Sequence, residues 1–443
     1  MPHLRLPRRH WIARSATGLL LLGALLGGCG TKEDPDEDSG NTGTLRIVNA
    51  TTLTSAAGLL IDDAARESSI ARDAASATYR VSAGSHTVAL ANSSGSALAS
   101  TTPTVAAGSA TTLVAWTGDN NVVKYLSLND LEAVPASGRT KLLVFHAARD
   151  AGTLDVHLTP AAEALGDTPL LGNVSPGSGS SGYSTVNAGS HRLRLLKAGS
   201  VLASDVRLDT TVTLPDAGVA ALVVTPSTGG VLAHALVLQP GKAVTALANA
   251  QARVRVVSAL PTNLSVAGAI NGTPLPLLGG SPAVSPYTLV PAGTSTPQVT
   301  VNGGTLTAAS WTAAPGSDNT LFVWGTGSAA QFTVFSDDNR LPASPSASRI
   351  RLLHGLADIP TDLKLSVADA EVSRASQGGF SPVTQVAAGS DITVSVSHAL
   401  TAASVYQLTG KTIDAGSVYS VLLLGDNRQT SGNGLITTVF KER

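Results

Sequence analysis

A four-residue motif that recurs at nearly even spacing decides the fold of this chain. The motif is Val-x-Ala-Gly, and it stands at Val81-Ser82-Ala83-Gly84, Val186-Asn187-Ala188-Gly189, Val290-Pro291-Ala292-Gly293 and Val386-Ala387-Ala388-Gly389. The four glycines lie 105, 104 and 96 residues apart. A period of this length, present four times, predicts about four tandem repeats of about one hundred residues each.

The residues between the motifs have the pattern of short β-strands. Apolar runs rich in Val, Leu and Thr are separated by Gly, Pro, Asn or Asp, and Leu363 to Val367 alternates apolar and polar residues as a half-buried strand does. About six to eight such runs per repeat predict an all-β fold of tandem immunoglobulin-like β-sandwiches. A β-propeller, the alternative, would repeat every 40 to 50 residues or so. The expected sandwiches span residues 44–136, 137–240, 249–343 and 347–443.

The N-terminus has the features of an exported lipoprotein. Four arginines precede an uncharged apolar run from Ala16 to Leu26, which at about half the length of a membrane span is typical of a signal peptide. Leu26-Gly27-Gly28-Cys29 then resembles the lipobox of bacterial lipoproteins, and Cys29 is the single cysteine of the chain. This resemblance implies a signal peptide at 1–28, lipid on Cys29 that anchors the protein in a membrane, and, with Gly30 next, sorting to the outer membrane.

Residues 29–43 form an expected acidic, disordered spacer between the lipid and the first sandwich. Asp34, Asp36 and Asp38 have the spacing that opens a calcium loop, but Ser39 and Leu45 stand where that loop needs Gly and Glu. We therefore predict no metal site and no cofactor. Without residues 1–28, 25 basic residues face 30 acidic ones, and no basic block is present to bind a nucleic acid.

The repeats open alike, and their openings resemble a known family. They run over Leu45–Asn49, Lys141–His146, Arg253–Ser258 and Arg349–His354. They resemble the bacterial family catalogued as domain of unknown function 4397, whose repeats begin with a strand ending in Val-x-His and then a Ser-Pro-Asp-Ala-Pro turn. The likeness extends over nearly all of residues 44–443 and is clearest at His146 with Asp150 and at His354 with Asp358. Asn49 and Ser258 replace the histidine in repeats 1 and 3. The resemblance implies a cell-envelope β-sandwich of unknown activity.

The two His/Asp pairs are the best candidates for chemistry. A histidine at a strand end, with an aspartate four residues later, is more typical of a hydrogen bond that holds a turn, and we prefer that interpretation for His146/Asp150 and His354/Asp358. The chain has no Gly-x-Ser-x-Gly elbow and no His-Glu-x-x-His motif. We therefore predict no catalytic residue and no enzyme.

The aromatic residues leave a second function open. Trp116, Trp311 and Trp324 could stack on sugar rings, although packing in the core is the preferred interpretation. The favoured function is a non-enzymatic structural or binding module of the cell envelope. The alternative is a carbohydrate-binding or adhesion protein, with a glycan or another envelope protein as its partner.

Overall fold

The structure is a computed structural model that describes residues 41–443 except 167, 262, 277 and 429–434. The signal peptide, Cys29 and nearly all of the acidic spacer lie outside the described residues, so these predictions are untested. No helix in the described part of the chain is long and apolar enough to cross a membrane.

The prediction of tandem β-sandwiches is confirmed. Each repeat has two main sheets, which we call the inner sheet, containing the opening strand of the repeat, and the outer sheet. In repeat 1 the inner sheet holds β1 (Thr42–Ala50), β4 (Ala74–Ala75), β5 (Tyr79–Ser82), β10 (Ala110–Thr117) and β11 (Val123–Asn129). Its outer sheet holds β2 (Ala56–Ile61), β3 (Ala64–Ala71), β7 (Val88–Ala91) and β8 (Ala97–Thr101), and β6 (Gly84–Ser85) pairs with β9 (Thr104–Val105).

Repeat 2 has the same plan. Its inner sheet holds β12 (Arg139–His146), β15 (Ser184–Asn187), β18 (Gly218–Pro226), β19 (Ala233–Leu238) and β20 (Thr245–Leu247). Its outer sheet holds β13 (Leu154–Pro160), β14 (Leu171–Val174), β16 (Gly189–Lys197) and β17 (Val206–Leu214). Short 3-10 turns lie at η1 (Asp119–Asn121) in repeat 1 and at η2 (Arg149–Ala151) and η3 (Ala203–Asp205) in repeat 2.

Repeats 3 and 4 complete the series. Repeat 3 has an inner sheet of β21 (Gln251–Ser258), β25 (Ala283–Val284), β26 (Thr288–Pro291), β31 (Asp318–Thr326) and β32 (Ala329–Asp337). Its outer sheet has β22 (Ser265–Ile270), β23 (Thr273–Pro274), β24 (Leu278–Gly280), β28 (Pro297–Val301) and β29 (Gly304–Thr307), and β27 (Gly293–Ser295) pairs with β30 (Trp311–Ala313). Repeat 4 has an inner sheet of β33 (Ala347–Leu356), β36 (Gly379–Phe380), β37 (Thr384–Ala387), β40 (Val418–Gly425) and β41 (Leu435–Lys441), and an outer sheet of β34 (Leu363–Val367), β35 (Ala370–Ala375), β38 (Gly389–His398) and β39 (Ser404–Ile413).

The opening strand has the same partners in every repeat. It pairs in parallel with a long strand from the end of the repeat, in the pairs β1–β10, β12–β18, β21–β31 and β33–β40. It also pairs antiparallel with the strand that carries Val-x of the motif, namely β5, β15, β26 or β37. The Ala-Gly that follows lies where the chain leaves the inner sheet. Gly84, Gly189 and Gly293 have φ of 146°, 96° and 119° there, values that residues with a Cβ rarely adopt.

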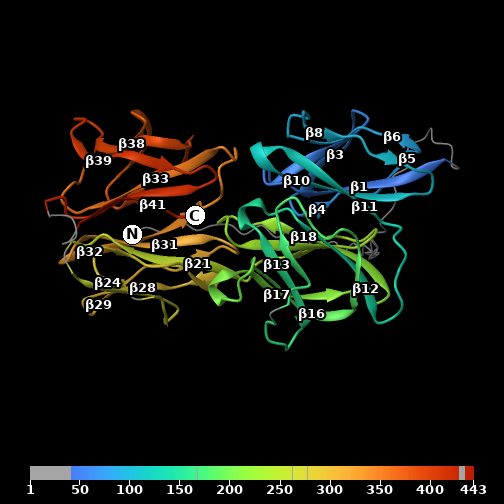
Figure 1. Cartoon of the computed structure of the whole chain (residues 1–443), viewed down its shortest axis with the longest axis horizontal. Coiled ribbons are helices and arrows are strands. Elements are labelled where there is room, and N and C mark those ends of the chain that lie inside the picture. The colour runs from blue at the N-terminus through green and yellow to red at the C-terminus, as the bar shows by residue number, and fades with distance from the viewer. Residues whose placement is uncertain (1–40, 167, 262, 277, 429–434) are drawn as a thin grey trace, which may run out of the picture.

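The repeats associate in two pairs through the outward faces of their inner sheets (Figure 1). Repeats 1 and 2 bury Val48, Trp116, Phe145 and Val223 between them, and repeats 3 and 4 bury Phe322 with Leu353, Leu422 and Leu424. Each pair is therefore a stack of four sheets, outer–inner–inner–outer. Because both faces of the central inner strands are covered, β10, β18, β31 and β40 are buried along most of their length, whereas outer strands such as β22 and β34 alternate.

One contact distinguishes the odd repeats from the even ones. Trp116 of repeat 1 lies over Gly177 of repeat 2, and Trp324 of repeat 3 lies over Gly378 of repeat 4. Both glycines have positive φ, 80° and 74°, and a Cβ added to them would come within 2.9 Å and 2.4 Å of the indole rings. The odd repeat supplies the tryptophan and the even repeat supplies the glycine, so the larger structural unit is a pair of unlike sandwiches.

Candidate functional site

The predicted His/Asp pairs do not come together as pairs. His146 is buried at the end of β12, where its Nε2 hydrogen-bonds to the carbonyl of Gly152 at 2.7 Å and its Nδ1 accepts from the Ala148 N–H at 3.2 Å. His354 makes the equivalent contact to the carbonyl of Thr361 at 3.1 Å. Burial lowers the pKa of both histidines and so favours their neutral forms. Each histidine holds the turn that follows its strand.

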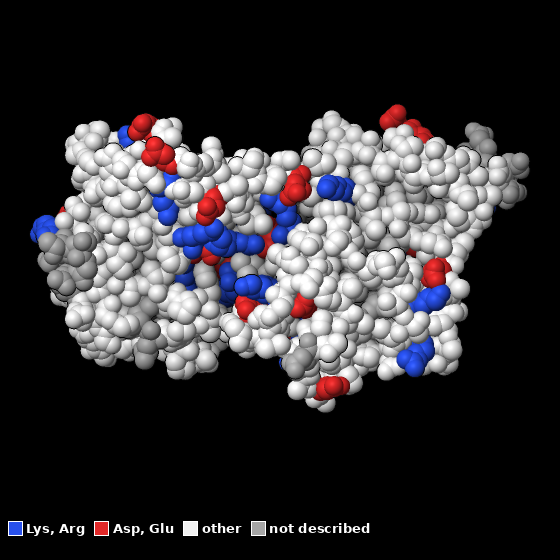
Figure 2. Space-filling view, viewed as in Figure 1, with Lys and Arg blue, Asp and Glu red and all other residues white. Residues whose placement is uncertain are grey.

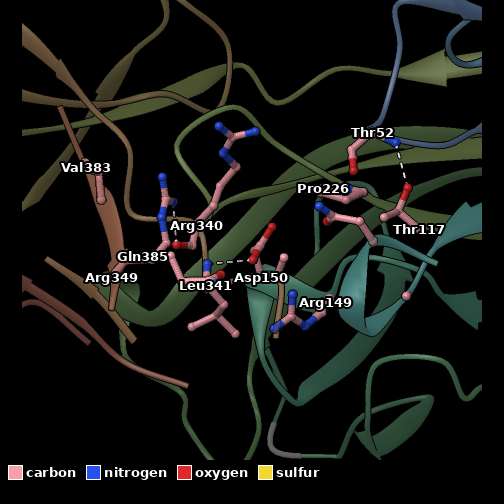
Figure 3. Close-up of a pocket in the computed structure, with 13 residues that line it drawn as sticks. Thr52, Thr117, Arg149, Asp150, Pro226, Arg340, Leu341, Arg349, Val383 and Gln385 are labelled. Carbon is pink, nitrogen blue, oxygen red and sulfur yellow. Dashed lines mark hydrogen bonds between the residues drawn. The ribbon is translucent and has the colours of Figure 1, made fainter. Parts of the chain in front are cut away.

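The two aspartates bind backbone groups elsewhere. Asp358 accepts from the N–H of Asn427, within repeat 4, at 2.9 Å. Asp150 instead accepts from the N–H of Leu341 at 2.8 Å (Figure 3), in the segment that connects repeats 3 and 4. The turn at η2 therefore joins repeat 2 to the second pair of sandwiches.

The two pairs meet at a junction built around this turn. Within the first pair, Arg149 Nε forms an ion pair with Asp119 at 2.6 Å, and across the junction the Asn120 N–H donates to the carbonyl of Ala343 at 2.8 Å. On the other side, the Gly229 N–H of repeat 2 donates to the carbonyl of Gly316 in repeat 3 at 3.2 Å. Figure 2 shows Lys and Arg side chains gathered in the hollow between the two halves of the molecule.

Two clefts lie at the junction, on either side of residues 149–152 and 339–341. The first, which we call the polar cleft, has a volume of about 320 Å³ (Figure 3). Arg340 and Arg349 both bind Asp338, at 2.9 Å and 2.7 Å, so the two guanidinium groups share one carboxylate. These two arginines hold the pKa of Asp338 far below its usual range against the opposing effect of burial. Its other lining residues include Thr52, Thr117, Asn121, Arg149, Asp150 and Gln385.

The second cleft, which we call the arginine cleft, has a volume of about 470 Å³. Four cationic side chains and one carboxylate line it: Lys197, Arg207, Arg253, Arg443 and Glu442. These residues come from β16 and β17 of repeat 2, β21 of repeat 3 and the two residues that follow β41 in repeat 4. The arginine cleft therefore exists only where three repeats meet.

A buried ion-pair network lies behind the arginine cleft. Arg255 of repeat 3 binds Glu442 of repeat 4 at 2.8 Å, and Arg351 of repeat 4 binds Asp337 of repeat 3 at 2.9 Å. All four side chains are 2% exposed or less. The ring of Tyr287 lies 4.6 Å from the Arg255 guanidinium. These crossed pairs tie the two sandwiches of the second pair together.

Sequence reasoning missed these arginines, although a signal was present. Arg46, Arg255 and Arg351 occupy the same position in the opening strands of repeats 1, 3 and 4, among apolar residues. Each donates Nε–H to the hydroxyl directly opposite on the parallel partner strand, that of Thr112, Thr320 or Ser420. In repeat 2 the two equivalent positions are Leu143 and Ala221, which are apolar.

The tryptophans pack mainly inside the protein. Trp116 is 7% exposed and meets the ring of Phe145 edge-on, with centroids 5.5 Å apart. Trp311 packs against the core of repeat 3. Since Trp116 is enclosed between repeats 1 and 2, it offers no face on which a sugar could stack. The part of the chain that the structure describes contains no group of three or more His, Cys, Asp or Glu side chains placed to hold a metal ion.

The family model named "Domain of unknown function (DUF4397)" matches residues 43–157 and 252–364. This chain belongs to the DUF4397 family. Each match spans an odd repeat and continues into the even repeat past its buried histidine, His146 or His354. The DUF4397 matches begin 209 residues apart, so they repeat with the pair of sandwiches and not with the single sandwich.

The solved structures that resemble this DUF4397 chain do so distantly. The Bacillus anthracis TIE protein is 9% identical with a TM-score of 0.15, over 86% of this chain and 68% of its own. A putative cell adhesion protein from Bacteroides uniformis is 12% identical with a TM-score of 0.21, over 45% and 99%. SpuA, a multi-modular glycogen-degrading pneumococcal virulence factor, is 11% identical with a TM-score of 0.17, over 60% and 37%. No curated protein matches the chain.

Proposed function

We propose that this DUF4397 protein is a non-enzymatic binding or structural module of the cell envelope, held in the outer membrane by lipid on Cys29. The proposal rests on the observation that the buried polar groups hold the structure together. His146 and His354 hold turns, and Arg255, Arg351, Asp337 and Glu442 join one sandwich to the next.

The contacts between repeats favour a single rigid body over four sandwiches on flexible linkers. The segment between repeats 3 and 4 binds both repeats of the first pair, since Ala343 accepts from Asn120 and Leu341 donates to Asp150. Such a body keeps the clefts at its centre in a fixed shape, which suits a module that binds or spaces other components. Function is then expected in the clefts and surface loops.

Membrane fractionation of the wild type and Cys29→Ala tests the anchor, and protease treatment of intact cells tests which side the module faces. We expect the wild type in the outer-membrane fraction and the variant in the soluble fraction. Identical fractionation of the two proteins would refute the lipid anchor. A hydrolytic activity that copurifies with the protein and is abolished by one substitution would refute the non-enzymatic assignment.

Carbohydrate binding or adhesion is the second candidate, and the polar cleft favours it. Thr52, Asn121 and Gln385 line this cleft beside Asp150 and Arg149, and such donors and acceptors match sugar hydroxyls. Binding to a glycan array that is lost in Gln385→Ala would support this function. An array without binding would refute it.

A further inference from the structure

The arginine cleft contains more positive charge than its carboxylates neutralise. Glu442 is the only acidic residue that lines it among the described residues, and both of its oxygens are engaged by Arg255, with Arg351 beside them at 3.3 Å. Arg253 is neutralised from behind by Asp318, which is fully buried. The remaining charges belong to Arg443 and Lys197, which form no ion pair among the described residues, and to Arg207, whose ion pair with Asp205 is long at 3.6 Å.

Arg207 lacks a close anionic partner. Its side chain is 11% exposed, and its nearest carboxylate among the described residues, that of Asp205, lies 3.6 Å away. Its Nε–H is buried without a hydrogen-bond partner in the described part of the chain. Burial, with repulsion from Arg253 and Arg443, lowers the pKa of Arg207 to about 10. A buried guanidinium in this state costs free energy, because its lost hydration is not replaced.

Arg443 is in a similar state. One of its terminal nitrogens donates to two backbone carbonyls, those of Gly230 at 3.2 Å and Asn339 at 3.3 Å. It forms no ion pair with a carboxylate of the described residues, and burial lowers its pKa also. The backbone oxygen of Arg443 accepts from the Val418 N–H at 3.2 Å in its own sheet.

We propose that the arginine cleft binds an oxyanion group, a phosphate, sulfate or carboxylate, between Arg207 and Arg443, with Lys197 at the rim. This inference rests on the proposed binding function and names the ligand chemistry. A guanidinium presents paired N–H donors that match two oxygens of such a group. The volume of about 470 Å³ falls in the range of small-molecule sites and exceeds what a single phosphate needs, so the oxyanion is carried by a larger polar molecule.

Titration of the purified Cys29→Ala protein with pyrophosphate, by calorimetry at constant ionic strength, tests the proposal. We expect saturable binding that weakens about tenfold in Arg207→Gln, because one charge-assisted contact is lost. Arg192→Gln is the matched control, since Arg192 lies on β16 and is 40% exposed and paired with Asp209. Binding by this control should equal that of the wild type.

Unfolding temperatures separate loss of the ligand contact from loss of the fold. Without ligand, Arg207→Gln should unfold at or above the temperature of the wild type, because a buried cation without a close partner has been removed. Pyrophosphate should raise the unfolding temperature of the wild type and of Arg192→Gln, but much less that of Arg207→Gln. An equal rise in all three would show general salt stabilisation and would overturn the proposal.

A phosphate group can also be presented by a lipid headgroup. Flotation of the Cys29→Ala protein with phosphatidylglycerol vesicles distinguishes this source. Flotation that is lost in Arg207→Gln, without pyrophosphate binding, would support the cleft with a headgroup as its ligand. Absence of both pyrophosphate and vesicle binding would overturn the oxyanion proposal and leave the fractionation result for Cys29 unaffected.

Discussion

Glu442→Gln is the substitution that best tests the ion-pair network between repeats 3 and 4. The Glu442 carboxylate accepts from both terminal nitrogens of Arg255 at 2.8 Å and from the Ser420 hydroxyl at 2.6 Å, and Arg351 lies 3.3 Å away. Gln has nearly the same shape, so the substitution removes the charge and leaves the volume. One uncompensated positive charge then stays buried.

Two independent arguments give the expected cost. The arginines lower the pKa of Glu442 from 4.5 to about 2 against the opposing effect of burial, and a shift of this size corresponds to about 3 kcal/mol of stability at neutral pH. Removal of one partner from a buried ion pair typically costs about 3 to 5 kcal/mol. We therefore expect Glu442→Gln to destabilise the second pair of sandwiches by about 3 kcal/mol.

Tryptophan fluorescence during urea unfolding can isolate this pair. In a Trp116→Phe background, the tryptophans beyond residue 28 are Trp311 and Trp324, both in repeat 3. The double variant Arg255→Met/Glu442→Gln restores charge balance and should be more stable than Glu442→Gln alone. Destabilisation below about 1 kcal/mol in the single variant, or a double variant whose loss equals the sum of its singles, would refute this account.

Three further predictions concern the pair contacts and the buried histidines. Gly378→Ala places a Cβ 2.4 Å from the Trp324 ring, so it should destabilise the second pair by about 2 kcal/mol more than Gly303→Ala does. Gly303→Ala is the control, because Gly303 has a similar φ and its added Cβ would have no neighbour within 4 Å. An equal loss of unfolding free energy in the two variants, measured with urea, would contradict the Trp–Gly contact. Burial and the nearby Arg72 lower the pKa of His234 to about 4, below that of the unfolded chain, so its contribution is fully present above pH 6.5 and is lost as the pH falls toward 4. Urea unfolding followed by Trp116 should show this loss, and His234→Gln should show less of it; identical pH profiles would argue against a buried neutral His234. Finally, His146→Ala should destabilise the first pair by about 2 kcal/mol, because the turn at η2 loses both hydrogen bonds to the imidazole; an unchanged urea midpoint would mean that the turn holds without them.

The sequence predicted the fold best at strands with one face exposed to solvent. Leu363 to Val367 alternates because Lys364 and Ser366 lie on the partly exposed face of the outer sheet, while Leu363, Leu365 and Val367 are buried. The turn role of His146 was also predictable, since a histidine at a strand end has carbonyls of the next turn within reach. In both cases the deciding partners lie nearby in the chain.

The contacts between repeats could not be predicted in this way. Arg46 and Arg255 hold the same position in their repeats, yet Arg46 donates to the carbonyls of Gln239 and Lys242, whereas Arg255 binds Glu442. The partner depends on which sandwich lies opposite, which the sequence of one repeat does not specify. The even repeats have His146 and His354 at the position where the odd repeats have Asn49 and Ser258, so the sequence already indicates that odd and even repeats differ. What this difference means depends on how the repeats pair in the structure.

The pairing of unlike sandwiches covers apolar surface within each stack. The contact of an odd tryptophan with an even glycine lies in an apolar interface that buries the outward faces of the two inner sheets against each other. The two stacks then join through polar and charged groups. Apolar residues can also fill a contact between repeats, as Leu143 and Ala221 of repeat 2 do between repeats 1 and 2. Arg207 and Arg443 are instead largely enclosed there, and among the described residues their one ion pair is the 3.6 Å contact of Arg207 with Asp205, which costs stability. An oxyanion in the arginine cleft would offset that cost.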